Sequence, residues 1–183
     1  MQHYFIGVKL PEGLARHLVD SQKEWHLELS HKTLPVAEDL HITLVYLGAV
    51  EAEVLTELIS ELNELNEVIP AIDLKLSGVS TFGNPSTPRV IYASIEEQPM
   101  LHKLQHAVLE KCLALSLRVD QKSFVPHITI AKKWSGKLDV FSKVMSIEQT
   151  SFTMKDFSIY SINPGKVPSY KPIHTIYLED LTT

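Results

Sequence analysis

A chain of 183 residues with 44% hydrophobic and 21% charged residues has the composition of an ordinary globular protein, long enough to bury a sizeable core. Its net charge of -5 excludes a protein that coats nucleic acid non-specifically, because such binding needs Lys and Arg to neutralise phosphates. Recognition of one nucleotide or one RNA end stays compatible with that charge, and no apolar run is long enough to predict a membrane-spanning helix.

Strand-like segments alternate with amphipathic helices along the whole chain. Strands are predicted where aromatic and β-branched residues gather or alternate with polar ones, and helices where apolar residues recur every three or four positions. In chain order the predicted elements are strand 4–10, helix 11–29, loop 30–39, strand 40–47, helix 51–66, strand 72–81, turn 82–88, strand 89–95, helix 98–117, strand 124–132, helix 138–145, strand 151–162, turn 163–165 and strand 170–178. No linker interrupts this pattern, so we expect a single domain over residues 1–183. The mixture of helices with strands that can form hairpins favours an α+β fold.

Two features of the predicted helices have a structural interpretation. The five glutamates of helix 51–66 lie off its apolar stripe, and we expect them to form a solvated face rather than a metal or partner site. The single cysteine, Cys112, cannot form an intrachain disulfide. It falls among the apolar positions of helix 98–117, which predicts a small buried side chain.

Two nearly identical tetrapeptides stand out against this background. They are His41-Ile42-Thr43-Leu44 and His127-Ile128-Thr129-Ile130, and each lies in a predicted strand. In a strand, side chains two positions apart leave from the same face. Each copy therefore presents one imidazole and one hydroxyl to a shared space, while its aliphatic residues point into the opposite layer.

Other histidines match the pattern less well. The tripeptide His31-Lys32-Thr33 is a third H-x-T match, but it falls in the predicted polar loop before Pro35, and we discard it. The remaining histidines are interpreted as structural. Among them His174 is the one whose predicted strand, 170–178, could lie next to the motif strands.

The two tetrapeptides suit chemistry at a phosphodiester. One histidine can accept a proton and the other can give one, since an unperturbed imidazole titrates near neutrality. The two threonine hydroxyls can bond the non-bridging oxygens, and Lys132 or Arg89 can stabilise their charge. From these residues alone, which histidine is the acid stays open. Phe5, Tyr46 and Phe124 are candidates for stacking on a base, although each also fits a place in the core.

The motifs in their order resemble a known family, the 2H phosphoesterases, and within it the bacterial and archaeal RNA 2′,3′-cyclic phosphodiesterases once called 2′-5′ RNA ligases. Residues 39–48 (DLHITLVYLG) and 124–131 (FVPHITIA) are similar to its two signatures. Residues 5–11 are similar to its opening strand and turn, and residues 81–93 to its middle hairpin. Two positions depart from the common pattern, because Lys132 stands where the family often has Arg, and Tyr46 where it often has Phe. Arg and Lys differ at a bidentate phosphate contact, so the first departure affects substrate preference.

The resemblance implies a fold, a reaction and roles for the motif residues. The fold is a bilobal α+β domain with two facing, mostly antiparallel sheets, outer helices, a central cleft and a pseudo-twofold relation. The reaction is hydrolysis of RNA 2′,3′-cyclic ends to 2′-phosphomonoesters. We expect it to need neither a metal ion nor a cofactor, because the five-membered cyclic phosphate is strained. His41 is the implied proton donor, His127 the implied proton acceptor, and Thr43 and Thr129 the phosphoryl contacts. Lys132, Arg89, Tyr46 and Phe5 are predicted to complete the substrate site.

Several alternatives and further expectations accompany this hypothesis. The chain could be a binding module that holds phosphorylated RNA ends or nucleotides without cleaving them, or it could join 2′-5′ ends in reverse. A metal site is disfavoured, because no Asp or Glu lies in either tetrapeptide and no known metal-ligand spacing occurs. The substrate could be an RNA end, a tRNA fragment, a 2′-5′ linked oligonucleotide or a small cyclic nucleotide. We expect a monomer without a stable protein partner, and a cytoplasmic location because the N-terminus does not look like a signal peptide.

Overall fold

The computed structural model describes residues 1–136 and 145–179 of the chain. The helix predicted at 138–145 falls outside these ranges except for its last residue. The strands are β1 His3–Lys9, β2 His31–Thr33, β3 His41–Ala49, β4 Ile72–Asn84, β5 Thr87–Ile95, β6 His127–Trp134, β7 Ser151–Met154, β8 Asp156–Ile162 and β9 Tyr170–Tyr177. The helices are α1 Glu12–Glu24, α2 Ala52–Asn63 and α3 Pro99–Ala114, with short 3₁₀ segments at Leu27–Leu29, Ala37–Asp39 and Glu64–Glu67.

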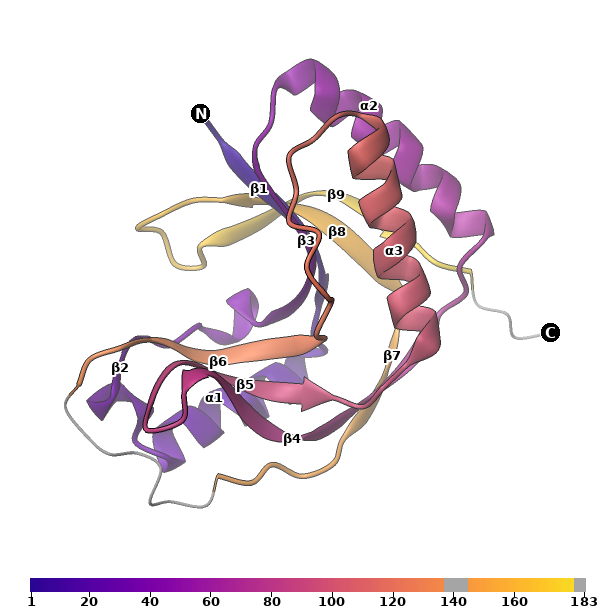
Figure 1. The fold of residues 1–183 in the computed structure, drawn as a ribbon. Coiled ribbons are helices and arrows are strands. Elements are labelled where there is room, and N and C mark those ends of the chain that lie inside the picture. Colours follow the sequence, from indigo (N-terminus) through magenta and orange to yellow (C-terminus); the bar gives the residue numbers. More distant parts are fainter. Residues whose placement is uncertain (137–144, 180–183) are drawn as a thin grey trace.

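The strands form one curled sheet made of two similar halves (Figure 1). Their order is β7-β4-β5-β6-β3-β1-β8-β9, with the short strand β2 added to β6, and every pair of neighbouring strands is antiparallel. The halves meet where β3 lies against β6, through the pair Ile42 and Ile128. Counting outward from this junction, β3-β1-β8-β9 corresponds to β6-β5-β4-β7. This confirms the predicted α+β fold with two antiparallel lobes, which are continuous through the junction.

The helices cover the outside of the sheet. Helix α1 lies against the half that contains β6, and the side chain of Gln22 donates a hydrogen bond of 2.9 Å to the Ile130 carbonyl. Helices α2 and α3 run side by side over the other half (Figure 1). Lys111 of α3 joins them through ion pairs of 2.7 Å to Glu61 and 2.6 Å to Glu64. These two glutamates therefore link two helices, whereas the sequence predicted only a solvated face.

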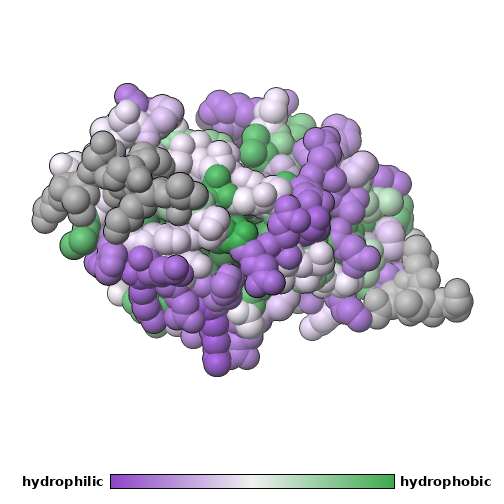
Figure 2. All heavy atoms as spheres, turned by 90° about the horizontal axis from the view of Figure 1, so that it is seen from below, coloured by the Kyte–Doolittle hydropathy of each residue, from purple (hydrophilic) through white to green (hydrophobic). Residues whose placement is uncertain are grey.

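The core lies between this outer layer and the sheet. The aliphatic motif residues Ile42, Ile128 and Ile130 are fully buried, as is Cys112 on α3. Burial of these isoleucines agrees with the alternation predicted for each tetrapeptide, in which the aliphatic residues point into the core, away from the face of the histidine and threonine. On the face seen in Figure 2, hydrophobic residues occupy small areas separated by hydrophilic ones. Within the described ranges, no helix is both long and apolar enough to cross a membrane.

Three segments differ from the sequence prediction because of long-range pairing. The predicted loop 30–39 contains β2, which finds a partner at the edge of β6. The predicted turn 82–88 is mostly strand, since β4 and β5 pair up to Asn84 and Thr87. The predicted strand 151–162 is two strands, because its first part pairs with β4 in one half and its second part with β1 in the other. None of these partners can be read from local periodicity.

Candidate functional site

The two tetrapeptides lie side by side at the junction of the halves. Because β3 and β6 are antiparallel with Ile42 opposite Ile128, a regular ladder places His41 opposite Thr129 and Thr43 opposite His127. In such a ladder directly opposed Cβ atoms lie about 4.5–5.5 Å apart and diagonal neighbours about 7–8 Å. On such a ladder the four polar side chains share one face, with the imidazoles on a diagonal. In agreement with this, Thr43 and His127 line the same cavity, and the charge of His127 acts on the pKa of His41.

The His41 imidazole is held on both of its nitrogens. Nδ1 donates a hydrogen bond of 2.7 Å to the Asp39 carbonyl. A carbonyl can only accept, so Nδ1 carries the proton of the neutral ring and Nε2 has the free lone pair. The Thr43 hydroxyl lies 3.0 Å from Nε2 and is placed to donate to it. The ring is flanked by Phe5 at 4.5 Å and by the edge-on ring of Tyr170 at 5.1 Å, measured between centroids.

The His127 imidazole has a matching setting in the other half. Its Nδ1 donates a hydrogen bond of 2.7 Å to the carbonyl of Val125, which is again the residue two positions earlier. Two aromatic rings pack against it edge-on, Phe82 at 4.9 Å and Tyr92 at 5.2 Å. In both histidines Nδ1 is bonded to a backbone carbonyl, so Nε2 is the nitrogen that can exchange a proton.

Burial disfavours the charged form of both imidazoles. It lowers the pKa of His41 from 6.5 to about 4, although the hydrogen bond to the Asp39 carbonyl opposes this change. The positive charges of Lys132 and of protonated His127 lower the pKa of His41 further. Burial also lowers the pKa of His127, against the raising effect of the Val125 carbonyl. In the free protein both rings are therefore neutral at pH 7.

The depressed pKa of His41 predicts a loss of stability in mild acid. Between pH 6.5 and pH 4 the unfolded chain binds a proton at this position and the folded chain does not, so the free energy of unfolding falls as the pH falls. A difference of 2.5 pKa units limits this loss to about 3 kcal/mol. Urea unfolding of the wild type and of His41→Asn at several pH values measures it. The stability advantage of the wild type should shrink from pH 6.5 to pH 4, and a difference that is constant with pH would contradict the assignment.

Three residues complete the surroundings of His41, and two of them were not predicted from the sequence. The Lys132 amine donates a hydrogen bond of 3.4 Å to the Tyr170 hydroxyl, beside the His41 ring. Asp39 is 7% exposed, and its carboxylate accepts the backbone N–H groups of Ser169 at 2.8 Å and of Tyr170 at 3.0 Å. Asp39 therefore holds His41 through its carbonyl and Tyr170 through its side chain. The signal in the sequence was that Asp39 begins the segment 39–48, which resembles the first signature of the family.

The other predicted substrate residues lie in different places. A cavity of about 390 Å³ opens beside Thr43 and His127, and its wall includes Arg89, Tyr46 and Phe124. Tyr46 is 52% exposed, so its ring is available to a ligand. Phe5 is only 3% exposed, because its ring is packed between His41 and Tyr160. Its position makes it a support for the imidazole and differs from the substrate contact predicted for it.

Two further histidines lie outside this site. His174 is on the outermost strand β9, which β1 and β8 separate from β3, and its Nε2 is 2.9 Å from the side-chain oxygen of Asn63. His31, of the discarded third match, is 3% exposed and is bonded to Ser30 and to the Pro88 carbonyl. The prediction of a polar loop without apolar support was wrong there, since β2 buries this ring against the sheet. His31 still does not face the two motif histidines as a third member of the site.

Comparison with known proteins places the chain in a family. A model of the 2′-5′ RNA ligase superfamily matches residues 11–165. An RNA 2′,3′-cyclic phosphodiesterase of Bacillus subtilis is 29% identical over 178 residues, 96% of each chain. A protein of the same name from Geobacillus stearothermophilus is 30% identical over 174 residues, 93% of this chain, which spans about half (55%) of that longer relative. E. coli LigT complexed with 3′-AMP has a TM-score of 0.83 at 19% identity, over 97% of this chain and 98% of that one, and so shares the fold. The chain belongs to the 2′-5′ RNA ligase superfamily of 2H phosphoesterases.

Proposed function

We propose that this protein hydrolyses RNA ends that carry a 2′,3′-cyclic phosphate, by general acid–base catalysis between two histidines. The observation that carries the proposal is the paired setting of His41 and His127, each with Nδ1 bonded to a backbone carbonyl, which leaves Nε2 as the nitrogen that can exchange a proton. In His41 this Nε2 also accepts a hydrogen bond from the Thr43 hydroxyl. The names of the Bacillus and Geobacillus relatives support the substrate class. The same names favour catalysis over a binding module that only holds such ends.

In the proposed reaction His127 acts on water and His41 on the leaving oxygen. Nε2 of His127 takes a proton from the water that attacks phosphorus. The bond from phosphorus to the 3′ oxygen breaks, and protonated His41 gives its proton to that oxygen. The product is a 2′-phosphomonoester with a free 3′ hydroxyl. The hydroxyls of Thr43 and Thr129 and the amine of Lys132 would bond the phosphoryl oxygens, where negative charge develops.

The role of His41 as the acid requires the substrate itself to change its protonation. With a pKa of about 4 in the free protein, His41 is neutral near pH 7. A bound phosphodiester brings a negative charge next to the ring, and an opposite charge within about 4–6 Å favours the protonated form. The anion also offsets the opposing charge of Lys132. Substrate binding thus favours the protonated form of His41, which can then act as the acid, whereas His127 can stay neutral and act as the base.

The decisive test offers the protein short RNAs that end in a 2′,3′-cyclic phosphate, in buffer with EDTA. We expect turnover into RNA ending in a 2′-phosphate, because the two imidazoles supply both proton transfers and the strained ring needs no metal activation. Chromatography against 2′- and 3′-phosphate standards identifies the product. Tight binding without turnover would favour the binding module, and activity only after addition of a divalent metal would overturn the two-histidine scheme. A free 5′-hydroxyl RNA in the same reaction tests for the reverse joining of ends.

We propose a cytoplasmic monomer. The support is the single cysteine, Cys112, which has no second cysteine to pair with and whose thiol is buried away from other molecules. Burial raises the pKa of this thiol to about 12, so it is not a reactive thiolate at neutral pH.

A further inference from the structure

A second cavity lies beside the aromatic rings that surround His41, and it shares no lining residue with the cavity beside Thr43 and His127. It encloses about 580 Å³, and its wall includes both Tyr160 and Tyr170, whose rings also lie near the His41 imidazole. Neither the two catalytic histidines nor the two threonines belong to its lining. Tyr170 therefore separates the catalytic residues from this second cavity, which we call the lysine pocket.

The lysine pocket is cationic on a protein that is acidic as a whole. Three lysines line it, Lys9 on β1, Lys166 in the turn between β8 and β9, and Lys171 on β9, against the single carboxylate of Glu38. Within the described part of the chain, Lys166 and Lys171 form no ion pair. The lysine pocket therefore concentrates positive charge, although the net charge of the protein is -5. Such a concentration favours the binding of a negatively charged ligand in this pocket.

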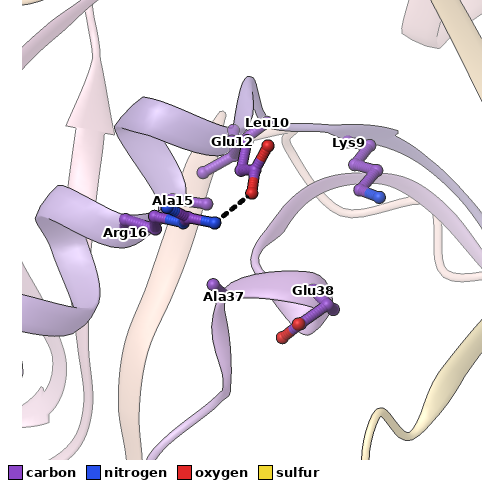
Figure 3. Close-up of a pocket in the computed structure, with 7 residues that line it drawn as sticks. All are labelled: Lys9, Leu10, Glu12, Ala15, Arg16, Ala37 and Glu38. Carbon is purple, nitrogen blue, oxygen red and sulfur yellow. Dashed lines mark hydrogen bonds and ion pairs between the residues drawn. The ribbon is translucent and has the colours of Figure 1, made fainter.

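The rest of the wall suits a nucleotide. The same wall includes Pro168, Pro172 and Ile173, of which Ile173 is 41% exposed. Amines that track a phosphate backbone, together with apolar or ring surfaces for the bases, form the usual combination in grooves that bind single strands. A smaller cavity beside α1 shares Lys9 and Glu38 with the lysine pocket, and Figure 3 shows Arg16 and Glu12 of its wall joined in an ion pair.

The chemistry of the substrate indicates which part of an RNA would lie here. A cyclic phosphate closes the 3′ end, so the RNA continues only from the 5′ oxygen of the last ribose. The base and the 5′ oxygen leave opposite ends of that ribose. If the phosphorus lies between His41 and His127, one end of the ribose faces the aromatic cavity with Tyr46, and the other faces Tyr170 and the lysine pocket.

We propose that the lysine pocket binds the sugar-phosphate backbone of the RNA that precedes the cyclic end, and so makes the protein prefer oligonucleotides over mononucleotides. The inference rests on the proposed function and adds a substrate class to it. Lys166 and Lys171 bind the phosphates upstream of the reacting one. They do not touch the reacting phosphorus, because Tyr170 and its hydrogen bond to Lys132 stand between.

The test compares two substrates and two matched double variants. The substrates are a nucleoside 2′,3′-cyclic phosphate and an RNA of about eight nucleotides with the same cyclic end. The variants are Lys166→Gln with Lys171→Gln, and the control Lys23→Gln with Lys103→Gln, which removes the same charge from exposed positions on α1 and α3. We expect the first variant to lower kcat/KM on the oligonucleotide on the order of ten-fold, with a salt slope reduced by about 0.7 for each lost phosphate contact. Its kcat/KM on the mononucleotide, and both values of the control, should stay within two-fold of wild type.

The outcomes separate this inference from the proposed function. Equal losses of kcat/KM on both substrates would place the two lysines at the reacting phosphate. No loss on the oligonucleotide would show that the upstream RNA lies outside the lysine pocket. Either result overturns the inference but leaves the proposed hydrolysis intact. If the wild type hydrolyses neither substrate, the proposed function fails. Fluorescence anisotropy with labelled RNA that ends in a 2′-phosphate then decides the inference by itself. Weaker binding of the first variant than of the control supports it, and equal binding overturns it.

Discussion

Replacing His127 with alanine is expected to lower kcat for hydrolysis of a 2′,3′-cyclic phosphate by about 10²–10⁴-fold, the usual contribution of a positioned base. Without Nε2 of His127, no group is placed to take the proton of the attacking water. His41→Ala should cost a similar factor on this substrate, because the departing ribose oxygen is a strong base that needs a proton. Steady-state kinetics with a single cyclic nucleotide measures both losses.

A change of leaving group distinguishes the acid from the base. A phosphodiester with a p-nitrophenolate leaving group needs little protonation as the bond breaks. On this substrate His41→Ala should lose much less activity than on the cyclic phosphate, whereas His127→Ala should lose about as much on both. The opposite pattern would exchange the two roles while keeping the two-histidine chemistry. The depressed pKa of His41 in the free protein makes this comparison necessary, since by itself it favours the neutral form of that ring.

Controls for these two variants come from the same sheet. His174→Ala removes an imidazole from β9, where the ring is bonded to Asn63 and does not face the catalytic cleft. Its kcat should stay near that of the wild type. Thermal unfolding of all three variants shows whether they fold. If His127→Ala folds and keeps most of its activity on the cyclic phosphate, the two-histidine mechanism is wrong.

Replacing Asp39 with alanine should destabilise the fold and slow the reaction together. The carboxylate accepts the backbone N–H groups of Ser169 and Tyr170 in a buried place, and its loss leaves both donors without a partner. An unsatisfied buried donor costs about 1–3 kcal/mol, so for the two donors we expect a loss of about 2–6 kcal/mol in the free energy of unfolding. The start of β9 then no longer holds Tyr170 against His41, and kcat should fall as well. Urea unfolding and kinetics on the same samples measure the two effects.

Asparagine at the same position is the matched control. The side chain of Asp39→Asn keeps its shape and one accepting oxygen, so it retains one of the two hydrogen bonds. We expect stability and kcat between those of the wild type and of Asp39→Ala. The Tyr170→Phe variant isolates the hydrogen bond from Lys132, since the ring beside His41 stays in place. An alanine variant as stable and as active as the wild type would show that the hairpin is held by its own strand pairing.

Much of the fold could be predicted because its signals are local. Apolar residues at Val54, Leu58 and Leu62 follow the helical period, and α2 forms there. The alternation in each tetrapeptide assigned the histidine and threonine to one face and Ile42 or Ile128 to the core, and both isoleucines are buried. Local periodicity could not find β2 or the break between β7 and β8. These depend on which strand edge is free to pair, and that edge belongs to a distant part of the chain.

The sequence by itself was enough to select the two histidines and the two threonines as candidate site residues, and to predict the strand face from which their side chains leave. Side chains alternate between the faces of a strand with a period of two residues, so the face follows from the order of the residues alone. The tertiary structure alone decided what surrounds His41. Asp39 and Tyr170 lie 131 positions apart, and they meet because β8 pairs with β1 while the β8–β9 turn folds back onto the start of β3. The pKa of His41 also depends on these distant segments, because they surround its ring in the folded protein. Burial and the charge of Lys132 set it, and neither is a property of the tetrapeptide.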